Sequence, residues 1–386
     1  MRQRWRPDRQ PGMAPSVMYF TDSPSFGGAE QVLLTLMEGF SRHQWRVILA
    51  HHAEPGLAPF VKATGEIGIQ LRALPRYVHK TPRSHAQQAR ALLYLLRSQR
   101  PDVFHANMAW PMAARYALLV AALARVPAVI ATIHSFDVAI SPRSALMHRL
   151  VGLGVDRYIA VSSFVADRLS TTLRVPPRKL RIVANGIQLR DFGAHDSTGR
   201  TVRSCARIPP VVLTPARLDP IKGHATLLAA AVKVPDTTFA FAGEGSAREA
   251  LTAYACRLGV ADRVRFLGHR SDIPDLLATS DLVVLPSLCE GFGLAVAEAM
   301  AAGKAVIATA AGAVPEIVRH GETGLLVQPA DPDALASAIR GLLADPAKAR
   351  RLGCAGREYA RHAFRADRMV DRVASVYTEI LGGAVS

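Results

Sequence analysis

Two carboxylates eight residues apart stand in the most informative stretch of the chain, residues 286–300. Glu290 lies in a glycine-rich turn after the apolar run 282–285, and Glu298 lies in the alanine-rich helical segment that follows. A strand, a glycine turn and a new helix bring unpaired backbone N–H groups and the helix dipole to one spot. The stretch therefore predicts an anion-binding site with two acids beside it.

The two acids narrow the choice of anion. A pocket for phosphate alone would not place carboxylates next to it, because like charges repel. Carboxylates do accept hydrogen bonds from hydroxyl groups, so the ligand should carry hydroxyls as well as phosphate. A nucleotide sugar carries both.

Further candidate ligand contacts follow other predicted strands. Gly27 and Gly28 come after the first apolar run and start a helix, where the backbone can approach an anion closely. A plain tight turn would use the same residues. Arg217 and Lys222 follow the predicted strand 211–214 and could converge on a pyrophosphate, the arginine as a fork and the lysine as a point charge. Solvated loop charges are the alternative.

Two glycines and two histidines complete the candidates. Gly243 and Gly245 follow the predicted strand 238–242, where the lack of side chains could admit a nucleotide or simply form a turn. His105 and His134 each end a predicted strand. Such a histidine is more often structural than catalytic.

The acidic residues and cysteines do not predict a metal site. Asp331 and Asp333 superficially match the D-x-D pattern that binds a metal–nucleotide pair in other transferases, but they precede a predicted helix and are interpreted as its N-terminal cap. No other carboxylate cluster has the spacing of a hard-cation site. The four cysteines are scattered and lack a C-x-x-C pair, as expected for reduced thiols in a cytoplasmic protein. We expect neither a metal nor a cofactor.

Length and composition suit a globular protein of two domains. The chain has 386 residues, of which 49% are hydrophobic and 20% charged. Its basic N-terminus lacks the apolar core of a secretory signal. Arginines and a proline interrupt the apolar region 110–133, which is interpreted as a buried helix and strand. We expect a cytoplasmic protein, peripheral on the inner face of the plasma membrane.

The net charge of +16 is carried almost entirely by one half of the chain. Residues 1–190 hold 25 Lys and Arg against 10 Asp and Glu, whereas residues 191–386 hold 22 against 21. A basic half can face nucleic acid, anionic lipid or a phosphorylated acceptor. An arginine-rich proteome is the alternative, although it does not explain the asymmetry. Residues 76–85 are the best candidate for the contact.

Apolar runs of strand length alternate with helical stretches along the whole chain, which predicts parallel sheets covered on both faces. Two such series predict two doubly wound α/β domains that face each other across a cleft and are joined near 188–210. Ligands of such sheets bind at the carboxyl ends of the strands, where the candidate residues fall. The expected strands are 17–20, 47–50, 103–105, 128–132, 158–161, 180–183, 211–214, 238–242, 264–267, 282–285, 305–308 and 324–327.

Taken together, these residues resemble the retaining glycosyltransferases of the GT-B fold, specifically family 4. Glu290 and Glu298, with Gly-Phe-Gly between them, match the E-x7-E motif of that family. One departure is that the usual Gly-Gly pair is Gly312-Ala313 here. Supporting matches run along nearly the whole chain, at residues 27–30, 161–163, 185–187, 217, 222–223, 243–245, 266–268, 312–316 and 321–327.

The resemblance implies a role for each matching residue. Glu290 would contact hydroxyls of the transferred sugar and Glu298 the ribose. Arg217 and Lys222 would neutralise the leaving diphosphate, and His134 would reach across the cleft toward the sugar and its leaving group. The other implied donor contacts are Gly27, Gly28, which lies under the phosphates, Gly243, Gly245, Phe292, Gly293 and Leu294.

The resemblance also implies which ligand each domain binds. Residues 1–190 would form the acceptor-binding domain and residues 191–364 the domain that binds the nucleotide sugar. The closing helix, within 365–386, would return to the first domain. Closure of the two domains would exclude water from the reaction.

The function implied is transfer of a hexosyl or N-acetylhexosaminyl unit, with retention and without a metal. The donor would be a UDP- or GDP-sugar, and the acceptor a glycan or lipid-linked molecule of cell-surface polysaccharide, lipopolysaccharide or glycolipid biosynthesis. A nucleotide-sugar epimerase of the same architecture is an alternative. A basic module that only binds, for example to nucleic acid, is disfavoured because helix-turn-helix, RNP-like and zinc patterns are lacking.

Overall fold

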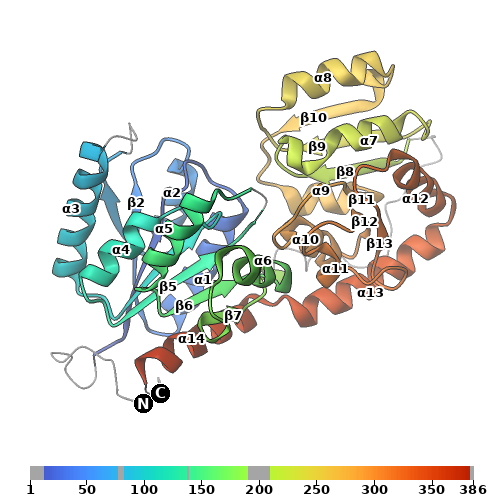
Figure 1. Ribbon diagram of the computed structural model, residues 1–386. Coiled ribbons are helices and arrows are strands. Elements are labelled where there is room, and N and C mark those ends of the chain that lie inside the picture. The colour runs from blue at the N-terminus through green and yellow to red at the C-terminus, as the bar shows by residue number, and fades with distance from the viewer. Residues whose placement is uncertain (1–12, 77–81, 137–138, 190–208, 383–386) are drawn as a thin grey trace. The chain divides into compact units, whose positions relative to one another are not determined.

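The computed structural model describes residues 13–76, 82–136, 139–189 and 209–382 (Figure 1). The chain divides into two compact units, Met1–Gly186 with Ala366–Ser386, and Ile187–Arg365. Each unit is built on one parallel sheet with helices around it, so the predicted fold class of two doubly wound α/β domains is confirmed.

The first unit contains a sheet of seven parallel strands in the order β3-β2-β1-β4-β5-β6-β7. Every residue of β1, β4 and β5 is buried, because helices cover both faces of a parallel sheet. This burial explains the nearly continuous apolar runs in the sequence. The strands are β1 (Ser16–Thr21), β2 (Arg46–His52), β3 (Gln70–Leu74), β4 (Val103–Met108), β5 (Ala128–Ile133), β6 (Arg157–Ala160) and β7 (Leu180–Ile182).

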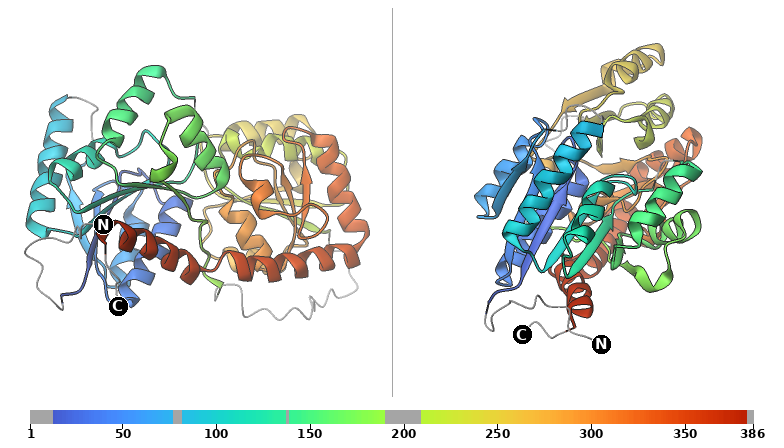
Figure 2. Two further views of the ribbon diagram at one scale, coloured as in Figure 1. Left: turned by 60° about the horizontal axis from the view of Figure 1, so that its bottom comes forward. Right: turned by 60° about the vertical axis from the view of Figure 1, so that its left-hand side comes forward.

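The helices of the first unit form two layers, one on each face of the sheet (Figures 1 and 2). In one layer α1 packs between α2 and α14, and in the other α3, α4, α5 and α6 pack in sequence. The sequence did not predict α2, β3 or α5. The bounds are α1 (Gly28–Arg42), α2 (Ala58–Glu66), α3 (Pro82–Gln99), α4 (Arg115–Leu123), α5 (Pro142–Gly152), α6 (Ser163–Leu173) and α14 (Ala366–Leu381).

A buried polar network attaches α14 to the sheet. The hydroxyl of Tyr377 is 2.5 Å from Nδ1 of His105 and 3.1 Å from the hydroxyl of Tyr19. Nε2 of His105 is 2.7 Å from Oγ1 of Thr132, and burial lowers the pKa of His105 to about 3. The prediction that His105 ends a strand is wrong: β4 continues to Met108, and this histidine is a neutral structural residue of the core.

The second unit contains six parallel strands in the order β10-β9-β8-β11-β12-β13. The strands are β8 (Val211–Pro215), β9 (Thr238–Ala242), β10 (Val264–Gly268), β11 (Leu282–Leu285), β12 (Ala305–Thr309) and β13 (Leu325–Val327). The helices are α7 (His224–Ala231), α8 (Arg248–Arg257), α9 (Ile273–Thr279), α10 (Leu294–Ala301), α11 (Val314–Ile317), α12 (Pro332–Ala344) and α13 (Pro346–Ala363).

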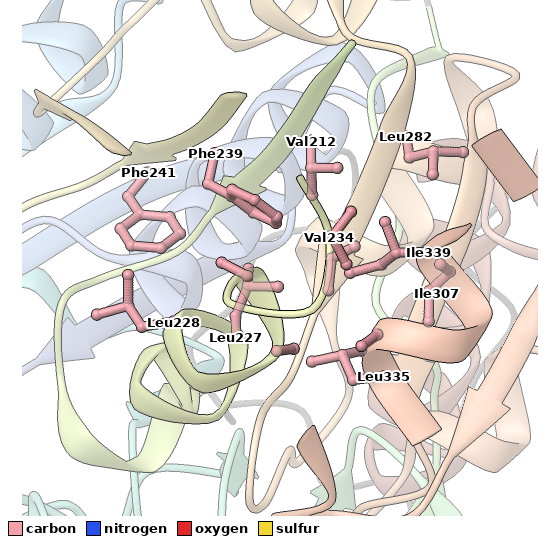
Figure 3. Packing of buried hydrophobic residues seen from close by; sticks show 14 of the residues in the cluster. Val212, Leu227, Leu228, Val234, Phe239, Phe241, Leu282, Ile307, Leu335 and Ile339 are labelled. Carbon is pink, nitrogen blue, oxygen red and sulfur yellow. The ribbon is translucent and has the colours of Figure 1, made fainter. Parts of the chain in front are cut away.

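Alternating side chains of the strands pack against α7, α8, α12 and α13 in one buried cluster of this unit (Figure 3). Phe239 and Phe241 lie two apart in β9 and so point to the same side. Leu335 and Ile339 lie four apart on α12 and so share a helix face. The predicted cap of α12 is confirmed, since Oδ1 of Asp331 accepts backbone N–H bonds at 3.0 and 2.9 Å.

Three predicted segments fall partly or wholly outside the described residues. They are the basic N-terminus, most of the joining segment 188–210, and residues 77–81 of the basic stretch 76–85. Among the helices that the structure describes, none is long and apolar enough to span a bilayer. The apolar region 110–133 contains α4 and β5, as predicted.

Candidate active site

Loops at the carboxyl edge of the second sheet touch one another through backbone atoms, because glycines leave room for the contact. Gly223 has a φ of +68°, and a Cβ at this position would lie 1.9 Å from the carbonyl oxygen of Pro286. Gly312 has a φ of +58°, and its Cβ would lie 2.1 Å from the carbonyl oxygen of Glu290. The backbone N–H of Ala313 donates to that carbonyl at 2.9 Å. The loops after β8, β11 and β12 are therefore fixed together.

The loop after β9 joins them in the same way. A Cβ on Gly243 would lie 2.1 Å from the carbonyl oxygen of Ala216, and one on Gly245 would lie 2.5 Å from that of Leu218. The N–H of Leu218 donates to the carbonyl of Glu244 at 3.0 Å. The predicted donor contacts Gly243 and Gly245 thus press against the loop that carries Arg217 and Lys222.

A mostly buried ion pair lies where these loops meet. Nζ of Lys222 is 2.7 Å from Oε1 of Glu290, and only 21% and 14% of the two side chains is exposed. Oγ of Ser287 donates to the same Oε1 at 2.7 Å. Thr309, at the end of β12, in turn donates to the carbonyl of Ser287. The position of the Glu290 carboxylate is therefore set by residues from the loops after β8 and β11 and from the end of β12.

Arg217 lies on the same loop as Lys222 but faces solvent. Its side chain is 63% exposed, and its Nη1 is 3.0 Å from Oδ2 of Asp219. An exposed ion pair of this kind contributes little to stability. The guanidinium can therefore leave Asp219 for an anionic ligand at small cost.

The remaining acid of the motif lies on α10. This helix begins after Gly293, whose φ of +100° suits glycine, so Leu294 is its first residue. Glu298 is half-buried in the middle of the helix. Phe292 is buried, with its ring edge-to-face against Phe364 at 5.5 Å between centroids, so its ring belongs to the core and only its backbone can face a ligand.

Sequence reasoning missed His224, which directly follows Lys222 and Gly223. It is the first residue of α7, and 1% of it is exposed. Its ring stands edge-on to Phe241 at 5.2 Å between centroids. Burial, together with the nearby Lys222 ammonium, lowers the pKa of His224 to about 4. A neutral ring therefore packs beneath the lysine loop.

In the first unit, the glycine loop after β1 is organised by a buried carboxylate. Oε2 of Glu30 accepts the N–H of Gly27 at 3.2 Å, and Oε1 accepts the hydroxyl of Thr21 at 3.3 Å. Burial raises the pKa of Glu30 despite these bonds. Gly27 is the cap of α1, and Gly28 is its exposed first residue.

His134 and the glycine loop are connected by Asn107, which the sequence did not single out. Nδ2 of Asn107 donates to the carbonyl of Ala29 at 3.3 Å, and Oδ1 is 2.7 Å from Nε2 of His134. A carbonyl only accepts, so the amide nitrogen faces Ala29 and the amide oxygen faces the histidine. His134 must then carry its proton on Nε2 and present Nδ1 as an acceptor.

Two further features keep His134 neutral and in place. Burial lowers its pKa to about 4, and its backbone N–H donates to the carbonyl of Met108 at 3.0 Å. His134 also lines a cavity of about 10 Å³, together with Asn107, Thr132 and Asn185. Such a volume holds about one water molecule.

Comparison with known proteins identifies the family. Residues 26–191 match the family described as Glycosyltransferase Family 4, and residues 206–359 match the one described as Glycosyl transferases group 1. A GDP-mannose-dependent alpha-(1-6)-phosphatidylinositol monomannoside mannosyltransferase of Mycobacterium tuberculosis is 32% identical over 271 residues, which are 66% of this chain and 70% of the relative. The chain is a family 4 glycosyltransferase.

Other relatives of the glycosyltransferase differ in what they act on. N-acetyl-alpha-D-glucosaminyl L-malate synthase of Bacillus anthracis is 26% identical over 286 residues, 72% of this chain and 75% of the relative. D-inositol 3-phosphate glycosyltransferase of Streptomyces avermitilis is 35% identical over 243 residues, 58% of this chain. That match spans about half, 52%, of the relative's length.

Solved structures confirm the GT-B fold. Anabaena Alr3699/HepE in complex with UDP and glucose superposes with a TM-score of 0.82 at 22% identity, over 94% of this chain and 99% of that one. A glycosyltransferase from Rickettsia africae gives a TM-score of 0.81 at 20% identity, over 96% and 100%.

The protonation state assigned to His134 in this glycosyltransferase can be tested directly by a substitution at Asn107. Asn107→Asp places a carboxylate against Nε2–H, which stabilises the imidazolium and raises the pKa of His134 above its present value of about 4. If transfer requires the neutral ring, the acidic limb of the kcat/KM profile moves to higher pH. Nitrogen-15 NMR of the imidazole reports the same shift without any substrate.

His148 serves as the internal control for that measurement. Its Nδ1 is 3.0 Å from the carbonyl of Pro111, and burial lowers its pKa to about 4 as well. Its NMR titration should be the same in the variant and the parent. An unchanged His134 titration in Asn107→Asp would contradict the assigned tautomer and contact.

Proposed function

We propose that this glycosyltransferase moves a hexosyl or N-acetylhexosaminyl unit from a UDP- or GDP-sugar to a glycan or lipid-linked acceptor, with retention and without a metal. The observation that carries the proposal is the Lys222–Glu290 pair, held by loops at the carboxyl edge of the sheet with the exposed Arg217 beside it. Support comes from Alr3699/HepE, solved with UDP-glucose, and from the GDP-mannose-dependent relative.

In this proposal, the two loop cations serve the leaving diphosphate and the acids serve hydroxyl groups. Lys222 and Arg217 stabilise the negative charge that develops on the diphosphate as the bond to the sugar breaks. Glu290 accepts hydrogen bonds from hydroxyls of the sugar, and Glu298 accepts them from the ribose. Gly243 and Gly245 keep side chains away from the nucleotide, and Gly28 does the same for the phosphates.

The hydrogen bonds of Glu290 help to decide between two mechanisms by which the configuration of the anomeric carbon could be retained. A retaining hydrolase uses a carboxylate nucleophile, but here Oε1 of Glu290 already accepts from Lys222 and Ser287. These bonds draw charge from the oxygen and make it a poor nucleophile. We therefore infer front-face attack: the acceptor oxygen bonds to the anomeric carbon, the bond to the diphosphate breaks, and a diphosphate oxygen takes the acceptor's proton.

His134 takes part as a neutral hydrogen-bond acceptor. With its proton on Nε2 and held by Asn107, its Nδ1 can accept from a sugar hydroxyl but cannot donate to a phosphate. The contact with the sugar that the family resemblance implied for His134 is kept in this proposal, and contact with the leaving group is assigned to Lys222 and Arg217 instead. We also propose that the enzyme works in the cytoplasm, in cell-surface polysaccharide or glycolipid biosynthesis.

The experiment is a donor screen with the full-length enzyme. UDP- and GDP-sugars are incubated with and without glycan and lipid-linked acceptors, in the presence of EDTA. We expect acceptor-dependent release of UDP or GDP, and a product whose anomeric proton coupling in NMR matches that of the donor. Inversion, a requirement for added divalent cation, or conversion of the donor to its epimer without acceptor would overturn the corresponding part of the proposal.

A further inference from the structure

Helix α5 carries large apolar side chains on its outward face. Its buried positions Ala145, His148 and Val151 recur every three residues and face the fold. The opposite face contains Leu146, Met147 and Leu150, followed after the helix end by Leu153, and these four side chains are between 52 and 78% exposed. A polar outer face would be usual for a surface helix.

Helix α4 extends this apolar surface. It packs against α5 and exposes Leu119 and Leu123 to 46% and 68%. The ends of the two helices touch: a Cβ on Gly154 would lie 2.6 Å from Cβ of Ala122. Leu153 directly precedes Gly154, and Leu123 directly follows Ala122. We call Leu119, Leu123, Leu146, Met147, Leu150 and Leu153 the α4–α5 patch.

Basic residues border the α4–α5 patch. Arg125 follows α4 and Arg143 lies in the first turn of α5, and both are exposed. At the other end of α5, Nζ of Lys179 donates to the carbonyls of Gly152 and Val155 at 2.8 and 2.6 Å, with the exposed Arg178 beside it.

Acidic residues are lacking in both helices that form the patch. Neither α4 nor α5 contains Asp or Glu. Asp156, which follows α5, accepts the backbone N–H of Val129 at 3.0 Å and is thereby held at the sheet. The patch thus combines an apolar centre with a cationic border, in the half of the chain that carries 25 basic against 10 acidic residues.

We propose that the α4–α5 patch docks the first unit onto an anionic lipid bilayer. Aliphatic side chains of a helix lying in the interface enter the boundary between headgroups and acyl chains, while arginines and lysines meet the lipid phosphates. A water-soluble acidic partner would match the border but would leave the leucines without a matching surface. An apolar partner would match the leucines but not the cations. The bilayer surface matches both.

One consequence rests on the proposed function. An enzyme held on a bilayer by the unit expected to bind the acceptor meets acceptors that are themselves in the membrane, which selects the lipid-linked class. The docking itself does not depend on catalysis. Vesicle binding therefore fails or succeeds independently of any transferase assay.

The test is sedimentation of the purified full-length protein with extruded vesicles. We expect binding to vesicles of phosphatidylcholine with phosphatidylglycerol, little binding to phosphatidylcholine alone, and weaker binding at high salt. Leu146→Ser/Leu150→Ser should lower the partition coefficient about tenfold or more, because two leucines no longer enter the bilayer. Arg143→Gln/Arg178→Gln should lower it by about fivefold per arginine and reduce its salt dependence.

A matched control lies in the second unit. Val232 is an apolar residue with 48% exposure that directly follows α7, and Val232→Ser should bind vesicles like the parent. Circular dichroism checks that each variant is folded. The proposal is overturned if the parent does not bind anionic vesicles, or if the leucine variant binds as well as Val232→Ser. It is also overturned if the leucine variant abolishes a dimer seen by sedimentation velocity without changing vesicle binding.

Discussion

Lys222→Ala should lower kcat for sugar transfer by about 10²–10³-fold, the usual effect of losing one charged or hydrogen-bonding group that stabilises the developing negative charge. Lys222 is suited to this role because only 21% of its side chain is exposed, so less water screens its charge. The substitution also removes the cation from Glu290, leaving Ser287 as its hydrogen-bond partner. Measured rates must therefore be expressed per folded enzyme, with the folded fraction taken from circular dichroism.

A second lysine in the same unit provides the control. Lys233 also pairs with a carboxylate, that of Asp333, but the two side chains are 54% and 70% exposed. Exposed pairs contribute little to stability, so Lys233→Ala should transfer sugar at the parent rate. If Lys222→Ala were as active as Lys233→Ala, the Lys222–Glu290 pair would have only a structural role.

The sequence pattern predicts most reliably the strands that are buried on both faces of a sheet. Strands such as β1, β4 and β12 are buried on both faces, so each residue must be apolar or paired, and a nearly continuous apolar run results. β3, at one edge of its sheet, escaped prediction because a glutamine and an arginine interrupt its apolar residues. Its sequence, Gln-Leu-Arg-Ala-Leu, buries only its last residue.

The helix α5 was missed for a related reason. A surface helix is recognised by one apolar and one polar face, whereas α5 has apolar residues on both faces. The same property makes its outward side a candidate membrane contact. The sequence alone instead indicated the basic stretch 76–85 as the membrane contact. Charged residues can be identified from the sequence, whereas the exposure of a leucine can be known only from the structure.

Within the candidate site, the sequence predicted the residue types but not their partners. Lys222 and Glu290 were assigned to different parts of the donor, and their pairing depends on loops 68 residues apart. His105 was misplaced because its partner Tyr377 is 272 residues away in sequence. Asn107 lies within a strand, and nothing in the neighbouring sequence indicates that it holds His134.

The glycine contact next to Lys222 should be sensitive to substitution. Gly223→Ala forces an alanine into a φ of +68° and places its Cβ 1.9 Å from the carbonyl oxygen of Pro286. The left-handed backbone costs about 1–2 kcal/mol, and the displaced loop adds about 1–3 kcal/mol of overpacking. We therefore expect the free energy of unfolding to fall by about 2–5 kcal/mol.

Gly259 separates these two contributions. Its φ is also +68°, but a Cβ there would meet nothing within 4 Å, so Gly259→Ala should incur only the backbone cost of about 1–2 kcal/mol. Tryptophan fluorescence would not report on the second unit, because residues 187–365 contain no tryptophan. Hydrogen exchange of peptides from β8 and β11 measures the second unit directly.

The two variants should also differ in activity. Pro286 precedes Ser287, which donates to Glu290, so a shift of this loop in Gly223→Ala displaces the acid as well as Lys222. Gly259 follows α8 and its contacts do not involve these loops, so Gly259→Ala should retain the parent kcat. Equal loss of exchange protection in both variants, with equal activity, would mean that the loops after β8 and β11 do not need their close contact, and the geometry assigned to the donor site would be wrong.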